Sequence, residues 1–325
     1  MIAHSPYRRF VGQVRQVLVG GPPSDEDRNI WNWYIATALL GAIDGGLWVF
    51  LPVFLARLNA SPTLLGLYNS LPALLSLFLL IPIGALVDRV SDTMAGWRRV
   101  SLAGRLMNVV FVVAPFFVPR EHLPLLIVVV WTLRTIPDTA SVPLWTAIAG
   151  RAVSPARRAH VNGTRWALMS LTSALCQTVF GRWLGTAGAL RIYQLVFGIS
   201  VVASLLEWSF FSRLRIVAVK AEDQPVPSSM LKERLRGYLQ PLVEHRPFVR
   251  FLAATFAYRV ALNMPSALFT LLHVRELRAS DALIGLRGAV GYVALVLGYL
   301  VWGRLASRLR HRKVLSLSAI GVAIY

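Results

Sequence analysis

Residues 61–89 read SPTLLGLYNSLPALLSLFLLIPIGALVDR, and residues 280–308 read SDALIGLRGAVGYVALVLGYLVWGRLASR. The two stretches align without a gap at a constant offset of 219 residues. Each consists of an apolar segment long enough for a helix and ends in basic residues. The seven identical pairs gather at both ends of the stretch: Ser61/Ser280, Leu64/Leu283, Gly66/Gly285, Leu67/Leu286, Gly84/Gly303, Leu86/Leu305 and Arg89/Arg308. The chain therefore contains an internal repeat of one helix followed by a basic loop.

The composition indicates that lipid surrounds most of this chain. Hydrophobic residues make up 56% of its 325 residues and charged residues only 15%, against roughly 45–50% and about 25% in soluble domains. A spanning helix needs about 20 mainly apolar residues. Eight segments meet this requirement, and a ninth begins near Val314: about 31–56, 64–87, 100–118, 123–146, 161–183, 191–211, 248–272 and 282–303. We predict an all-α polytopic membrane protein and, because the ninth span breaks off, a C-terminally truncated one.

The distribution of basic residues predicts the orientation in the membrane. With the N-terminus inside, the inner segments 1–28, 88–105, 151–165, 213–250 and 304–313 hold 25 of the 34 Lys and Arg residues. Inner loops of membrane proteins carry such an excess. The net charge of +19 therefore indicates membrane topology and not a nucleic-acid partner. We expect a multi-pass protein of the cell inner (cytoplasmic) membrane with a cytoplasmic N-terminus.

The spacing of the spans divides the chain into four regions. Residues 1–30 form a cytoplasmic amphipathic arm, and residues 31–211 a membrane half with six helices. Residues 212–247 read as a cytoplasmic linker with a basic amphipathic helix, which is suited to anionic headgroups. Residues 248–325 would then form part of a second half.

The basic loops resemble the signature of the major facilitator superfamily. The first copy reads Gly84-Ala-Leu-Val-Asp88-Arg89 and, after five extra residues, Gly96-Trp-Arg-Arg. The second copy starts at Gly303 and reaches Arg308, with Ser in place of the acid. The resemblance implies two six-helix halves, the second incomplete here, that alternate access to a central pathway. It also implies an inner gate, with small residues at close helix contacts; the alternative is that these residues only fix loop topology. The gate residues would be Gly84, Asp88, Arg89, Gly303 and Arg308.

Asp44 is the first candidate for the transport pathway. It lies in the middle of the first predicted span, within Gly41-Ala-Ile-Asp44-Gly45-Gly46. A charge at this depth costs about 2.5–3.5 kcal/mol on insertion scales and so needs a reason. We predict that Asp44 binds substrate or a proton. The alternative is a satisfied polar contact between helices.

Two further pairs of charged or polar residues lie inside predicted spans. Arg134 and Asp138 are four residues apart in the fourth span and share a helical face, so they either neutralise each other or line the pathway. Arg259 and Asn263 have the same spacing in the seventh span, which lines the central cavity in the family that the chain resembles. Two weaker candidates are Gln177 and Glu207.

Together these features predict a secondary active transporter that moves a small solute across the cytoplasmic membrane by alternating access. Proton coupling is an expectation that rests on Asp44 alone. We expect a monomer in the lipid bilayer, with no catalytic residue, metal, cofactor or nucleic acid. Two alternatives are a non-transporting lipid-handling or sensor protein of the same fold, and a polytopic membrane enzyme. The enzyme would need His, Asp and Glu clustered at an interface, and the sequence shows no such cluster.

Overall fold

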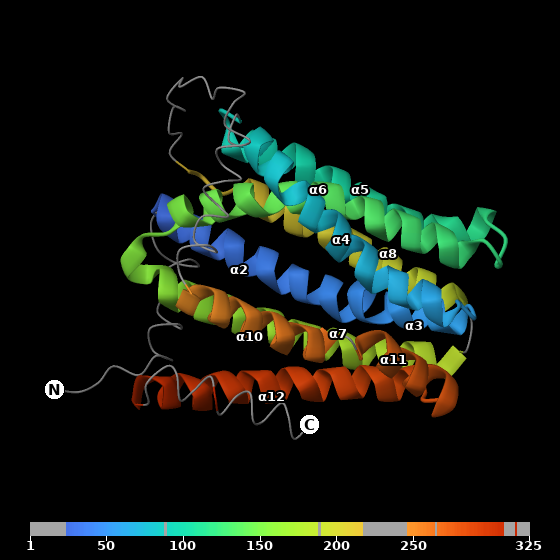
Figure 1. The fold of residues 1–325 in the computed structure, drawn as a ribbon. Helices are drawn as coiled ribbons and strands as arrows, with labels where there is room; N and C mark the ends of the chain where they lie inside the picture. The colour runs from blue at the N-terminus through green and yellow to red at the C-terminus, as the bar shows by residue number, and fades with distance from the viewer. Residues whose placement is uncertain are drawn as a thin grey trace.

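The computed structural model describes residues 24–87, 90–187, 190–216, 246–263, 265–308 and 316, and the regular structure in these ranges is helical. Most of the predicted N-terminal arm and of the linker lies outside them. Long helices run side by side (Figure 1). They are α2 (Asp25–Ile43), η1 (Asp44–Trp48), α3 (Val49–Arg57), α4 (Pro62–Val87), α5 (Thr93–Phe117), α6 (Leu123–Ala152), α7 (Pro155–Ala187), α8 (Leu190–Ser212), α10 (Arg246–Asn263), α11 (Ser266–Leu271), η2 (Leu272–Glu276) and α12 (Asp281–Arg308).

Each of the eight predicted spans falls on helical structure. Among the described residues, six helices are long and apolar enough to cross a membrane, the first of them formed by α2, η1 and α3 in continuation. The others belong to α4, α5, α6, α8 and α12. The helices α7 and α10 occupy the predicted spans 161–183 and 248–272 but are not among the six. A reason in α7 is its four arginines, Arg157, Arg158, Arg165 and Arg182.

The repeat found in the sequence begins with the same helix cap in both copies. The hydroxyl of Ser61 accepts a hydrogen bond from the backbone N–H of Leu64 at 3.1 Å. Ser280 accepts the equivalent bond from Leu283 at 3.3 Å. Such a bond satisfies one of the free N–H groups in the first turn of a helix, so these identities mark the starts of α4 and α12.

The turn before each cap also repeats: residues 58–61 read Leu-Asn-Ala-Ser and residues 277–280 read Leu-Arg-Ala-Ser. Asn59 has a backbone φ of 59° and Arg278 a φ of 47°, the left-handed conformation that side chains other than glycine rarely adopt. The two residues are again 219 positions apart. The structural repeat therefore extends two residues further upstream than the Ser61/Ser280 pair, through Ala60 and Ala279.

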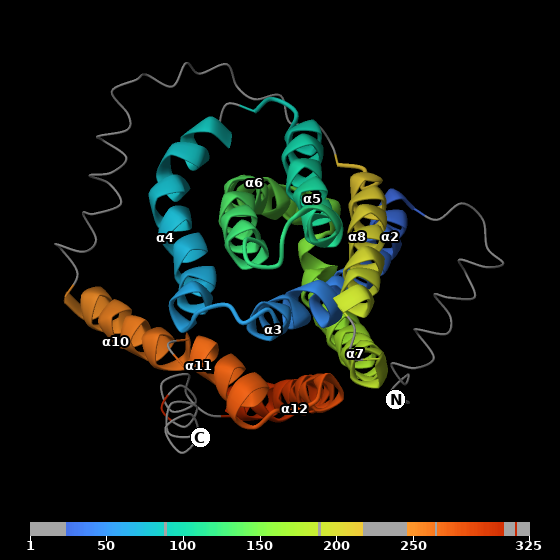
Figure 2. The ribbon, with the colours of Figure 1, turned by 90° about the vertical axis from the view of Figure 1, so that its right-hand side faces the viewer.

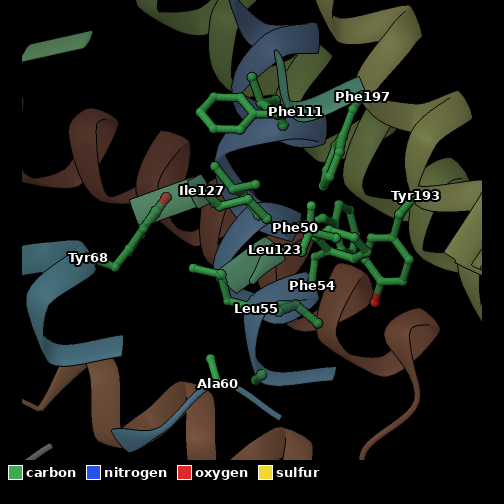
Figure 3. Packing of buried hydrophobic residues seen from close by; sticks show 14 of the residues in the cluster. Phe50, Phe54, Leu55, Ala60, Tyr68, Phe111, Leu123, Ile127, Tyr193 and Phe197 are labelled. Atoms are coloured by element: carbon green, nitrogen blue, oxygen red, sulfur yellow. The ribbon is translucent and has the colours of Figure 1, made fainter. Parts of the chain in front are cut away.

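Two apolar clusters hold the helices of the first 216 residues together. One lies at the end of the bundle where α3 meets α4, and Phe54 packs there against Tyr193 and Phe197 with ring centroids 5.0 and 5.6 Å apart (Figure 3). The other lies at the opposite end, around Trp33 and Phe211. Because these clusters bury aromatic rings at both ends, they fix the positions of the polar groups between them.

Helices α11 and α12 pass beside α3 and α7 (Figure 2). The closest approach involves glycines: a Cβ built on Gly285 would lie 2.2 Å from the carbonyl oxygen of Gln177 and 3.1 Å from Gly181. A Cβ on Gly84 would meet no atom of a described residue within 4 Å, so the tight contact predicted there stays a prediction. Small residues of α7 and α12 bring these two helices together, because their backbones touch at Gly181 and Gly285.

Candidate functional site

Asp44 lies where three helical segments meet. It opens the π-helical turn η1, and its carboxylate accepts a hydrogen bond from the hydroxyl of Ser173 on α7 at 2.8 Å. The hydroxyl of Tyr292 on α12 donates to the same oxygen, Oδ2. The predicted mid-span acid is therefore a polar contact between helices, and its partners lie 129 and 248 residues away in the chain.

Glycines around Asp44 allow the neighbouring helices to come this close. A Cβ on Gly41 would lie 2.6 Å from the carbonyl oxygen of Met169, and one on Gly45 would lie 2.6 Å from that of Ser173. On the other side, a Cβ on Gly46 would clash with Ser200, whose hydroxyl accepts a hydrogen bond from the N–H of Leu47 at 3.1 Å. The π turn leaves backbone groups to be satisfied by side chains, and Ser200 does this for Leu47.

Arg134 and Asp138 form an ion pair along α6. Two nitrogens of the Arg134 guanidinium donate to Oδ2 of Asp138, at 3.0 and 2.7 Å. A third donates to the side-chain oxygen of Asn108 on α5 at 3.2 Å, and the guanidinium lies 4.7 Å from the centre of the Trp131 ring. Arg134 is buried, whereas half of the Asp138 side chain is exposed. The predicted neutralisation of Arg134 by Asp138 is present in the structure.

A second ion pair, between Arg105 on α5 and Glu207 on α8, was missed by the sequence reasoning. Arg105 was counted with the inner segment 88–105, but it lies well inside α5, where Nε and Nη2 both donate to Oε2 of Glu207. The backbone oxygen of Ser204 accepts a further bond from Nε at 3.0 Å. A usable signal was present, since Arg105 is the single charged residue of the predicted span 100–118 and Glu207 the single acidic residue of the predicted span 191–211.

The two ion pairs line one cavity. Its volume is about 300 Å³, and its walls come from α2, η1, α5, α6 and α8. A second cavity of about 260 Å³, between α4 and α6, shares Arg134 and Asp138 with the first. The Arg134–Asp138 pair therefore lines both cavities.

Arg165 also lies deeper than its assignment to the inner segment 151–165 implied. It is buried in α7, with its guanidinium 3.9 Å from the centre of the Trp33 ring and 5.4 Å from that of Trp145. Its Nε donates to the hydroxyl of Thr37 at 2.9 Å. A count of basic residues places Arg165 in an inner segment. In the structure its charge lies inside the fold, because aromatic rings cover it.

The two repeated turns contact each other at one end of the bundle. Arg57, at the end of α3, donates to the carbonyl oxygen of Ala279 at 2.6 Å. Arg275, in η2, donates to the carbonyl oxygen of Ala60. The exchange is reciprocal, since each arginine binds the backbone of the other turn. It brings residues 57–60 and 275–279 together.

An ion pair lies next to this exchange. Arg57 also reaches Asp281 at 3.0 Å, and the hydroxyl of Tyr193 on α8 donates to the other oxygen of Asp281 at 2.7 Å. Asp281 is buried, so both of its oxygens are bound where water is scarce. The start of α12 is thereby tied to α3 and α8.

The remaining candidates lie away from these groups. Arg259 and Asn263 are exposed on α10 and line neither cavity; the amide of Asn263 donates to the carbonyl oxygen of Arg259 at 2.7 Å. Asp88 and Arg89 lie outside the described residues. Gly303 and Arg308 belong to α12 by their backbones, and the side chain of Arg308 lies outside what the structure describes. The described residues therefore do not test the predicted inner gate.

One comparison with known proteins gives a match. The sequence profile of the Major Facilitator Superfamily matches residues 33–325, from the first span to the last residue. No curated protein matches the chain significantly.

Proposed function

The chain belongs to the Major Facilitator Superfamily, whose members are membrane transporters, and on this premise we propose that it is a secondary active transporter of a small solute. The two halves, 31–211 and 248–325, would move against each other to open the pathway first to one side of the membrane and then to the other. The observation that carries this proposal is the reciprocal contact of the repeated turns, in which Arg57 binds Ala279 and Arg275 binds Ala60. Repeats related by an axis along the membrane normal are expected to meet in this way.

The contacts at the end of the repeated turns fit one stage of the transport cycle. At the end of the repeated turns the two proposed halves are joined by hydrogen bonds and an ion pair. With the N-terminus inside, this end would face the outside, so we propose a state in which the pathway is closed to the outside.

Asp44 is the proposed residue that senses the movement of the halves. Its carboxylate is shared between Ser173 of the first half and Tyr292 of the second. A rotation that separates α12 from α7 would remove Tyr292 and leave a charged oxygen in the membrane without that donor. Such an oxygen strongly favours binding a proton or a hydrogen-bond donor of the solute. Binding at Asp44 and movement of the halves would thus be coupled.

Solute counterflow tests the proposal directly. The purified chain is reconstituted into liposomes loaded with a panel of unlabelled solutes, and uptake of each labelled solute is followed. We expect counterflow of at least one solute, and we expect Asp44→Asn to abolish it, because the amide has no charge to balance and cannot take up a proton. Asp92→Asn is the matched control, because Asp92 only caps α5 and Asn caps a helix equally well.

The outcomes separate the parts of the proposal. Full activity of Asp44→Asn would remove Asp44 from the pathway. No flux of any solute with folded protein would overturn the transporter assignment and favour a non-transporting role. Uptake driven by a pH gradient in the unsubstituted chain would establish proton coupling. If a pH gradient drives no uptake, facilitated exchange is the remaining mode of transport.

A further inference from the structure

The cavity of about 300 Å³ among α2, α5, α6 and α8 has balanced charges on its wall. Arg105 and Arg134 face Glu207 and Asp138, two cations against two anions. A ligand with a net charge would leave that charge uncompensated beside the buried Arg134 and Glu207, which is costly. A ligand without net charge meets no such penalty, so the cavity discriminates by charge.

The cavity wall leaves a ligand both acceptors and donors of hydrogen bonds. Both carboxylates receive their arginine bonds on one oxygen only, Oε2 of Glu207 and Oδ2 of Asp138. The second oxygen of each carboxylate receives no hydrogen bond from a described residue. Arg134 donates from Nε, Nη1 and Nη2 to Asp138 and Asn108, which uses three of the five N–H groups of its guanidinium. A ligand whose groups both donate and accept hydrogen bonds, as hydroxyls do, therefore fits this wall.

The space in front of these oxygens is kept open by a glycine. A Cβ on Gly104 would lie 3.2 Å from Oδ1 of Asp138, so any larger residue there would crowd the second oxygen of that carboxylate. Three indole rings, those of Trp48, Trp97 and Trp145, complete the wall with flat apolar surface. The volume lies at the lower end of the roughly 300–1,000 Å³ typical of small-molecule sites, so the ligand must be small.

We infer that this cavity binds a small electroneutral solute rich in hydroxyl groups. The hydroxyls donate to the second oxygens of Glu207 and Asp138, as charge-assisted hydrogen bonds, and the indole rings cover the apolar face of the solute. The inference deepens the proposed function, because it names the solute class that would be transported. The site lies within the first half and is distinct from the contact of Asp44 between α7 and α12.

Thiol labelling tests the charge selectivity without any transport. Cys176 is the single cysteine, so Cys176→Ala provides a background free of thiols for Ser141→Cys, which places one on the cavity wall. Three methanethiosulfonates are compared: uncharged hydroxyethyl, cationic trimethylammonioethyl and anionic sulfonatoethyl. Rates are divided by those of Ser91→Cys, an exposed position before α5, which corrects for intrinsic reactivity. We expect the uncharged reagent to retain at least about tenfold more of its rate than either charged reagent.

Charge variants test the physical cause of that selectivity. In the Ser141→Cys background, Glu207→Gln should favour the anionic reagent and Arg105→Gln the cationic one. The double variant Arg105→Gln/Glu207→Gln should restore the preference for the uncharged reagent, because the wall is neutral again. Leu40→Cys, on another part of the same wall, repeats the series in case Ser141→Cys does not fold.

Protection by solutes then identifies the class. Erythritol, xylitol and myo-inositol serve as neutral polyols, tetramethylammonium as the cation and acetate as the anion. We expect at least one polyol, and neither ion, to slow the labelling of Ser141→Cys several-fold while Ser91→Cys is unchanged. Protection by an ion alone, an unchanged preference in the charge variants, or no labelling by any reagent would each overturn the inference. Counterflow can fail while these results hold, so the two proposals are separable.

Discussion

The two copies of the repeat, α4 and α12, share a sequence signature but differ in how they pack. Both begin with a capped turn in the same backbone conformation. At the fifth residue after the cap, however, Gly285 of α12 touches α7, whereas a Cβ on the equivalent Gly66 of α4 would meet no atom of a described residue within 4 Å. Tyr292 of α12 reaches Asp44, and the equivalent position in α4 is Ala73. A shared signature therefore specifies how a helix begins, while its neighbour determines its contacts.

The largest expected effect concerns the two equivalent glycines. Gly285→Ala should force α12 away from Gln177 and lower the stability of the protein by about 1–3 kcal/mol, as overpacking of a core does. Gly66→Ala should leave stability unchanged or raise it by up to about 1 kcal/mol, because alanine favours helix where it meets no neighbour. Thermal denaturation of the purified variants in detergent measures both. Equal melting temperatures would mean that α7 and α12 are not in contact in solution.

An intermediate effect is expected at the residue after each cap, which is Asp281 in α12 and Pro62 in α4. Asp281→Asn replaces the ion pair with Arg57, a charged hydrogen bond worth about 1.5–3 kcal/mol, by a neutral one worth about 0.5–1.5 kcal/mol. We expect the closed end to open more often. Labelling of Ala279→Cys, a buried position, in the Cys176→Ala background should become about tenfold faster, since a factor of ten corresponds to about 1.4 kcal/mol.

The control for this measurement is Asp92→Asn, which changes an acid far from the repeated turns. It should not alter the labelling of Ala279→Cys. An unchanged rate in Asp281→Asn would show that the Arg57–Ala279 and Arg275–Ala60 contacts close this end without the ion pair.

The smallest effect, and one that the two copies should share, concerns the caps. Ser61→Ala and Ser280→Ala each remove one side-chain bond to the first turn, which costs about 1 kcal/mol. We expect similar decreases in melting temperature for the two variants. A much larger decrease for Ser280→Ala would indicate that the start of α12 also supports its contact with α3 and α8.

The helical fold and the family could be predicted from the sequence because both depend on local patterns. Apolar length predicted the positions of the helices, and the loops at Gly84-Ala-Leu-Val-Asp88-Arg89 and Gly303 indicated the superfamily that the profile confirms. The Arg134–Asp138 pair was predictable as well, because four residues make one helical turn. Each of these inferences needs only residues that are close in the chain.

The ends of the helices and the depth of their charges were harder to predict. Arg105 and Arg165 were assigned to inner segments, but each lies inside a helix, where Glu207 neutralises Arg105 and Trp33 covers Arg165. A count of basic residues per loop treats every arginine near a helix end alike. Only the neighbours of a side chain decide whether that arginine lies in water or in the fold.

The sequence by itself determined that this chain is a helical membrane protein with a repeated helix, where its helices lie, and which family it belongs to. It also identified Asp44 as a charge that needs a partner. Only the tertiary structure decided that the partners are Ser173 and Tyr292, that Arg57 and Arg275 exchange contacts between the repeated turns, and that two ion pairs share one cavity. Helix periodicity and hydropathy are properties of neighbouring residues, whereas these contacts, apart from the Arg134–Asp138 pair, join residues 102 to 248 positions apart. Such contacts form only when helices pack, and one sequence alone does not fix which helix faces meet.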